Sequence, residues 1–168
     1  MNRHILSVLV ENQSGVLSRV SGLFSRRGYN IDSLSVGETE DSGVSRMTLV
    51  VRGDGQILEQ IRKQLKKLID VIKVVELDPS RSVFRELALI KVKTDMTARA
   101  SVIQLVDIFR ANIVDVAADS LTVEMTGDEA KIQAFIALMN SYGIAEIART
   151  GLTALQRGNK AIKNLKEI

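Results

Sequence analysis

The chain has 168 residues, of which 45% are hydrophobic and 26% charged, a balance typical of a globular protein with one domain or two small ones. It contains no cysteine, which excludes disulfides and thiolate metal sites, and its formal net charge of +3 is too small by itself to indicate nucleic-acid binding. The sequence shows neither a secretory signal nor a membrane-spanning stretch, so we expect a cytoplasmic protein with no membrane contact.

The first half of the chain alternates between strand and helix patterns. Residues 5–10 are apolar at nearly every position, which predicts a central strand. Residues 15–27 repeat apolar side chains with the period of a helix, and Gly28 stands where a helix commonly ends. The elements expected after it are strands over 29–36 and 46–52 joined by a polar hairpin loop at 38–43, a helix over 57–68 and a strand over 71–77.

This order is βαββαβ, and the second half of the chain repeats it. The repeat is expected as strands over 86–94, 113–116, 121–126 and 144–149 and helices over 97–110 and 128–140. The predicted fold class is therefore α+β, with two tandem ferredoxin-like units. The expected boundaries are a first domain at 1–78, a linker at 79–83 that contains Pro79, a second domain at 84–156 and a frayed basic tail at 157–168.

The turn between the first strand and the first helix is the best candidate binding site. The first N–H groups of a helix lack intrahelical partners and lie at the positive end of its dipole, so this turn can hold a small anion such as an amino-acid carboxylate. Gly15 has no side chain to block a close approach. The alternative is that Asn12 or Ser14 is an ordinary N-cap that binds nothing.

No reaction centre is visible in the sequence. His4 is the single histidine and is expected to be a surface residue, and the glycines around Asp54 do not form a phosphate-binding loop. Several carboxylates gather near the hairpin loop, where a solvated turn explains them and a hard cation would bind only weakly; these are Asp32, Glu38, Glu40 and Asp41. We therefore expect no catalytic residues, no metal site and a protein that binds rather than reacts.

Two blocks of the sequence resemble a known family. They are Leu9-Val10-Glu11-Asn12-Gln13-Ser14-Gly15-Val16-Leu17-Ser18-Arg19-Val20 and Gly22-Leu23-Phe24-Ser25-Arg26-Arg27-Gly28-Tyr29-Asn30-Ile31. Shorter matches follow at 45–48, 58–65 and 83–87. Together they resemble the small, regulatory subunit of acetohydroxyacid synthase (acetolactate synthase), whose first unit is an amino-acid-binding ACT domain.

The resemblance implies a non-catalytic regulatory subunit that forms a homodimer through its ACT domains, whose sheets join at the second strand. It implies a catalytic large subunit as partner, which holds thiamine diphosphate, Mg and FAD and which this chain activates and makes sensitive to feedback inhibition by valine. The effector site implied by the family lies between protomers, at Asn12, Gln13, Ser14, Gly15, Val16 and Leu17 of one chain and Asn30 and Ile31 of the other.

These positions suggest how valine would bind. The backbone N–H groups of residues 14–16 would take its carboxylate, and the side chains of Asn12 and Asn30 would supply polar contacts, including acceptors for its ammonium group. The apolar side chains of Val16, Leu17 and Ile31 would surround its isopropyl group.

Two other readings stay open at this point. One is a free-standing ACT-type sensor that controls another enzyme or transcription. The other is a nucleic-acid-binding protein that uses the basic tail and four cations of the second helix, Arg62, Lys63, Lys66 and Lys67.

Overall fold

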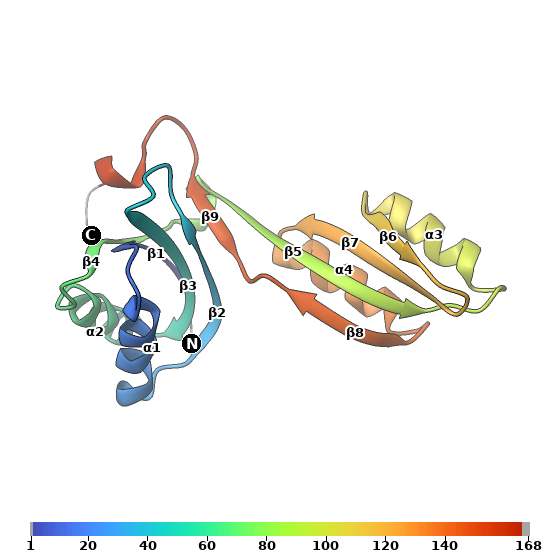
Figure 1. Cartoon of the computed structure of the whole chain (residues 1–168), viewed down its shortest axis with the longest axis horizontal. Helices are drawn as coiled ribbons and strands as arrows, with labels where there is room; N and C mark the ends of the chain where they lie inside the picture. Colours follow the sequence, from blue (N-terminus) through green and yellow to red (C-terminus); the bar gives the residue numbers. More distant parts are fainter. Residues whose placement is uncertain (1, 166–168) are drawn as a thin grey trace. The chain divides into compact units, whose positions relative to one another are not determined.

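The computed structural model describes residues 2–165 and divides the chain into two compact units. The first unit comprises the chain up to Val83 together with the segment that starts at Leu152, and the second unit is Phe84–Gly151. Each unit is built on four strands and two helices in the order βαββαβ, as predicted, and the first unit also contains a short strand near the end of the chain (Figure 1).

The first unit is a four-stranded antiparallel sheet in the order β2-β3-β1-β4, with two helices on one face (Figure 1). Its elements are β1 (Asn2–Glu11), α1 (Val16–Arg27), β2 (Ile31–Glu38), β3 (Val44–Gly53), α2 (Gly55–Leu65) and β4 (Val71–Glu76). The core lies between the helices and the sheet, and Leu6, Phe24 and Ile61 are among its fully buried side chains. This arrangement leaves β2 at one edge of the sheet.

The ends of the first unit's helices follow from local chemistry. The Asp54 carboxylate accepts hydrogen bonds from the N–H groups of Gln56 and Ile57, so it caps the N-terminus of α2. At the other end of α1, Gly28 adopts a left-handed conformation with φ +67°, and its N–H donates to the Ser25 carbonyl. The end of α1 at Gly28 matches the sequence-based expectation, whereas α2 spans Gly55–Leu65 instead of the expected 57–68.

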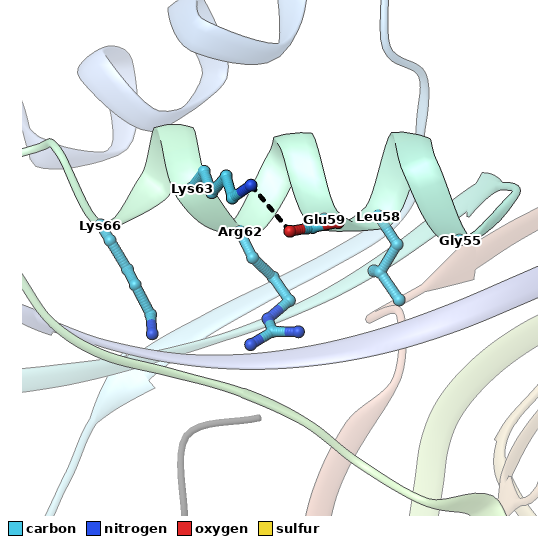
Figure 2. A pocket seen from close by; sticks show the side chains of 6 residues that line it. All are labelled: Gly55, Leu58, Glu59, Arg62, Lys63 and Lys66. Atoms are coloured by element: carbon cyan, nitrogen blue, oxygen red, sulfur yellow. Dashed lines mark ion pairs between the residues drawn. The ribbon is translucent and has the colours of Figure 1, made fainter.

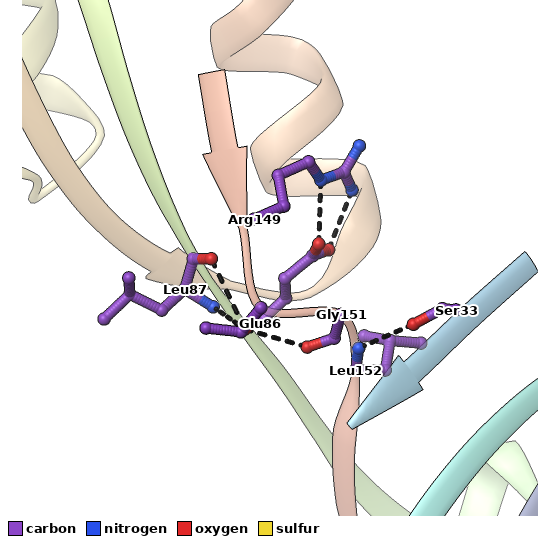
Figure 3. A network of polar contacts seen from close by, with 7 residues as sticks. Ser33, Glu86, Leu87, Arg149, Gly151 and Leu152 are labelled. Carbon is purple, nitrogen blue, oxygen red and sulfur yellow. Dashed lines mark hydrogen bonds and ion pairs between the residues drawn. The ribbon is translucent and has the colours of Figure 1, made fainter. Parts of the chain in front are cut away.

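The second unit has the same topology, with sheet order β6-β7-β5-β8. The short helix η1 (Pro79–Arg81) leads into it. Its elements are β5 (Ser82–Lys93), α3 (Arg99–Ile108), β6 (Asn112–Val116), β7 (Ser120–Gly127), α4 (Glu129–Met139) and β8 (Ile144–Arg149). Ile90, Val123 and Phe135 are fully buried between the sheet and the two helices, and Phe109 packs edge-on against Phe135. The Glu86 carboxylate accepts two hydrogen bonds from Arg149 and ties β5 to β8 (Figure 3).

The end of the chain differs from the prediction of a second domain that reaches residue 156 and a frayed tail after it. The chain leaves the second unit at Gly151 and returns to the first, where it forms β9 (Thr153–Gln156), which pairs with β5, and η2 (Ile162–Asn164). Two serines of β2 hold Leu152: its N–H donates to Ser33 Oγ at 3.0 Å (Figure 3). Its carbonyl accepts from Ser35 Oγ at 2.7 Å.

The reason for this return is the second face of the first sheet. Ile5, Leu9 and Val50 alternate with the core-facing residues, so they point away from α1 and α2, yet all three are buried. Leu152 and Ile162 are buried in the same unit, the latter only 6% exposed. An apolar second face needs a cover, and the C-terminal segment from Leu152 to Leu165 provides it.

Candidate effector-binding site

The β1–α1 turn presents a helix N-terminus without a side-chain cap. Gly15 is the N-cap residue of α1, with φ +84° and ψ −9°, and in the part of the chain that the structure describes no side chain caps this end. The prediction that Asn12 or Ser14 acts as an ordinary N-cap is therefore wrong. The nitrogen of Val16 is 3.5 Å from the Gln13 carbonyl oxygen. This is a long, weak hydrogen bond, so the Val16 N–H group is available for a stronger acceptor.

The side chain of Asn12 faces the β2–β3 hairpin loop instead of the helix. Its Nδ2 donates to the Ser42 carbonyl at 2.9 Å and to Glu38 Oε1 at 3.1 Å, and its backbone N–H donates to the Gly43 carbonyl at 2.8 Å. The amide therefore fixes the turn against the end of β2. Because both of these side-chain hydrogen bonds use Nδ2, the Oδ1 atom is the one suited to accept from an ammonium group.

Arg19, which the helical period places on the polar side of α1, lies beside the turn. A Cβ atom added to Gly15 would be 2.9 Å from Arg19 Nη1, so the guanidinium lies directly over the glycine. Arg19 Nε donates to Asp70 Oδ2 at 2.6 Å, and Asp70 is largely buried at the start of β4. This hydrogen bond lowers the pKa of Asp70 and raises that of Arg19, which keeps a fixed positive charge at the turn.

The one sequence signal for Arg19 was its spacing. It follows Gly15 by one helical turn, and residues four apart lie on the same face of a helix. Its partner Asp70 is distant in sequence, so that contact could be read only from the fold.

The predicted wall of the site is only partly available. Val16 is 3% exposed and belongs to the core, so it offers a backbone N–H group but no side-chain surface. Leu17, by contrast, is 45% exposed beside the turn. Ile31 is half-buried against the core, and the exposed Asn30 donates from Nδ2 to Asp32 Oδ1 at 3.0 Å.

The two groups of predicted site residues lie at opposite ends of the sheet within one chain. Ile31 is in register with Val51, which pairs with His4, whereas Glu38 is in register with Ser45, which pairs with Val10. From His4 to Val10 the sheet extends about 20 Å, at about 3.3 Å per residue. One chain therefore does not bring Asn30 and Ile31 to its own β1–α1 turn.

The carboxylates and the histidine that the structure describes form no candidate metal site. In residues 2–165, no group of three or more His, Asp or Glu side chains is arranged to hold a metal ion. His4 is not the surface residue we expected, because its side chain is only 15% exposed and its Nδ1 lies 2.7 Å from Glu76.

The carboxylates of the hairpin region are engaged one by one rather than as a cluster. Asp32 pairs with Arg52, whose hydrogen bond lowers its pKa, and Glu40 pairs with Lys163. Asp41 accepts from the Gly43 N–H, and Glu38 accepts from Asn12. The solvated-hairpin interpretation fits these contacts.

The basic side chains of α2 do not form a single stripe that would follow a nucleic-acid backbone. Lys63 pairs with Glu59 at 2.7 Å, while Arg62 and Lys66 point to another side of a pocket of about 450 Å³ (Figure 2). The aromatic rings that would stack on bases are not on an open sheet either, since Phe24 and Phe135 are buried in the two cores. No described helix is long and apolar enough to span a membrane.

Comparison with known proteins gives concordant results. The family model described as "AHAS small subunit-like ACT domain" matches residues 6–73, and that described as "Small subunit of acetolactate synthase" matches residues 85–158. A probable acetolactate synthase small subunit of Methanothermobacter thermautotrophicus is 54% identical over 160 residues, or 95% of each chain. The acetolactate synthase small subunit of Mycobacterium bovis is 55% identical over 163 residues, or 97% of each.

A solved structure agrees with the sequence comparisons. The crystal structure of the acetolactate synthase small subunit from Thermotoga maritima is 45% identical, with a TM-score of 0.89, and the match covers 95% of this chain and 100% of that one. The fold and the uncapped turn thus define a regulatory protein with an N-terminal ACT domain and a second ferredoxin-like unit. More specifically, the chain belongs to the acetolactate synthase small subunit family.

Proposed function

We propose that this chain activates the catalytic large subunit of acetolactate synthase in the cytoplasm and makes it sensitive to feedback inhibition by valine. The effector site is formed by two copies of the chain, from the β1–α1 turn of one and the start of β2 of the other. The observation that carries this proposal is the position of these two segments at opposite ends of the sheet in a single chain.

Two copies paired along β2 would bring together the two groups of site residues that lie far apart in one chain. β2 is an edge strand, and edge strands present unpaired backbone groups to a second strand. In a two-fold antiparallel pairing, the first residues of one β2 lie beside the last residues of the other. Asn30 and Ile31 of one protomer then approach the end where Asn12 contacts Glu38.

The chemistry of the turn suits a free amino acid. The N-terminus of α1 and the Arg19 guanidinium both favour a carboxylate, the helix dipole contributing about 0.3–1 kcal/mol at an exposed site and up to about 2 when partly buried. Leu17 and Ile31 supply apolar surface. Each buried methylene contributes about 0.8 kcal/mol, so valine should bind better than alanine, whereas valine and isoleucine should be hard to distinguish.

Inhibition then follows from the two-chain position of the site. A ligand shifts an equilibrium only by its difference in affinity between two states. Valine bound across the β2 seam favours one arrangement of the two chains, and the catalytic subunit responds to that arrangement. Catalysis, with thiamine diphosphate, Mg and FAD, resides in the partner subunit.

The test is an activity assay of the catalytic large subunit with and without this chain, titrated with valine. We expect the chain to raise the activity and valine to reverse the increase. Alanine at the same concentrations serves as the matched ligand control and should have little effect. Copurification without activation, or activation that valine leaves unchanged, would contradict the proposal and favour a sensor of another enzyme.

A further inference from the structure

A second pocket lies in the first unit, between the sheet and the C-terminal segment. It encloses about 280 Å³, enough for a small organic molecule. Polar side chains from both sides line it: Glu40, Arg46, Gln156, Asn159, Lys160 and Lys163. The pocket exists only because the chain returns from the second unit, so no sequence pattern indicated it. It is separate from the β1–α1 turn, none of whose residues line it.

Arg46 is the half-buried charge of this pocket. It lies on β3 opposite Leu9, a residue of the second, covered face of the sheet. Burial lowers the pKa of the guanidinium, with the Glu40 carboxylate acting in the opposite direction. Within residues 2–165 its hydrogen bond is to Ser7 Oγ at 3.5 Å, the longest that still qualifies. Five N–H donors on a half-buried arginine are thus poorly used.

The neighbouring charges do not compensate for Arg46. Glu40 is mostly exposed, and its carboxylate is 3.4 Å from Lys163 Nζ, so it is shared with that lysine. Among the described residues that line the pocket, Arg46, Lys160 and Lys163 are three cations against the one carboxylate of Glu40. A partly buried cation without a close partner is costly, and an anion with two or three oxygens matches the guanidinium fork well.

We propose that this pocket binds a small carboxylate- or phosphate-bearing anion through Arg46, and that the bound anion holds the C-terminal segment against the sheet. The lysines come from that segment and the arginine comes from the sheet, so an anion between them links the two. Lys73 also holds the C-terminal segment, since its Nζ donates a hydrogen bond to the Lys163 carbonyl at 2.8 Å. The site does not depend on the valine site.

The test uses the full chain and two probes, inorganic phosphate and succinate, titrated at constant ionic strength. Backbone amide shifts of Gly158, Lys160 and Lys163 report the pocket, and calorimetry gives the affinity. We expect saturable shifts at these residues with at least one probe, and the stronger probe identifies the class of anion. Arg46→Gln should weaken binding at least tenfold. The control Arg26→Gln removes the same charge from the last turn of α1 and should bind like wild type.

Three outcomes would overturn the proposal. They are shifts that grow linearly without saturation, shifts that centre on other residues, and equal affinity for Arg46→Gln and wild type. Should Arg46→Gln fail to fold, Arg46→Lys keeps the charge but loses the fork, and the wild-type shift map still decides. Limited proteolysis gives an independent readout: the anion should slow cleavage after Arg157 in wild type and leave the rate unchanged in the variant.

Discussion

Replacing Gly15 by aspartate tests the effector site at its centre. The substitution puts a side chain on a residue with φ +84°, and its Cβ would be 2.9 Å from Arg19 Nη1. The left-handed backbone costs about 1–2 kcal/mol for a residue with a Cβ, somewhat less for aspartate. The guanidinium can rotate away, so we expect the chain to fold with modest destabilisation.

The effect on valine binding should be much larger than the effect on folding. The new carboxylate would occupy the place of the effector carboxylate, next to Arg19 and the N-terminus of α1. Two like charges 4 Å apart repel by about 1 kcal/mol in water and about 4 kcal/mol at the effective dielectric of a protein surface. At about 1.4 kcal/mol per factor of ten, valine affinity should fall roughly 5- to 1,000-fold.

The assay is calorimetric titration of valine into the full chain, alongside activation of the catalytic subunit. Gly15→Asp should lose valine binding and still activate the partner. Gly15→Ala is the matched control, since it adds the Cβ and the backbone strain without the charge, and it should lose less affinity. If both variants lose valine affinity equally, the electrostatic reasoning is wrong. If Gly15→Asp binds valine like wild type, the location of the site is wrong as well.

Three further predictions concern the proposed effector site, the pairing of two chains along β2 and the ion pair beside the β1–α1 turn. Asn30→Ala should weaken valine binding by about 0.5–1.5 kcal/mol, one net hydrogen bond, and unchanged affinity in calorimetry would remove Asn30 from the site. Val36→Lys puts a charge on the edge strand β2 and should give a folded monomer in sedimentation, whereas Ile69→Lys, at a 93% exposed position, should stay dimeric. The pKa of Asp70 is lowered in the folded chain, so its contribution to the free energy of unfolding is complete at neutral pH and is lost as the pH falls below the ordinary value of 3.8. Urea unfolding of Asp70→Asn should therefore show a smaller loss of stability in acid than urea unfolding of wild type.

The order of elements could be predicted from the sequence because each half carries strong local patterns. The helices over 16–27 and 129–139 repeat with one apolar stripe, and Asp54 and Gly28 mark ends that local chemistry decides. The family resemblance of the first unit also holds.

Predictions failed where distant contacts decide. The segment after residue 156 is basic and weakly amphipathic, so it looked like a tail, yet the apolar second face of the first sheet holds it. His4 looked exposed because its partner Glu76 is 72 residues away. Arg19 looked like a solvated helix residue because Asp70, 51 residues away, cannot be paired with it by any local rule.

The two units differ at the turn where we propose that the effector binds. The corresponding turn of the second unit joins β5 to α3, and there Asp95 Oδ1 accepts from the N–H groups of Thr97 and Ala98 at 2.9 and 2.7 Å. This carboxylate lies in the turn just before α3, whose N-cap residue Ala98 itself has no side-chain cap. Hydrogen bonds from the Thr97 hydroxyl and from the N–H groups of Ala98 and Thr97 lower the pKa of Asp95, which keeps it charged.

In α1 the N-cap position belongs to Gly15, which has no side chain to cap the helix. The described helices α2 and α4 instead begin with an aspartate that accepts backbone N–H groups, Asp54 and Asp128. Among the α-helices that the structure describes, α1 and α3 have no side-chain cap, and α1 is the one whose N-cap residue is a glycine with the Arg19 guanidinium beside it. We therefore expect an effector carboxylate at this end, where Gly15 brings no side chain.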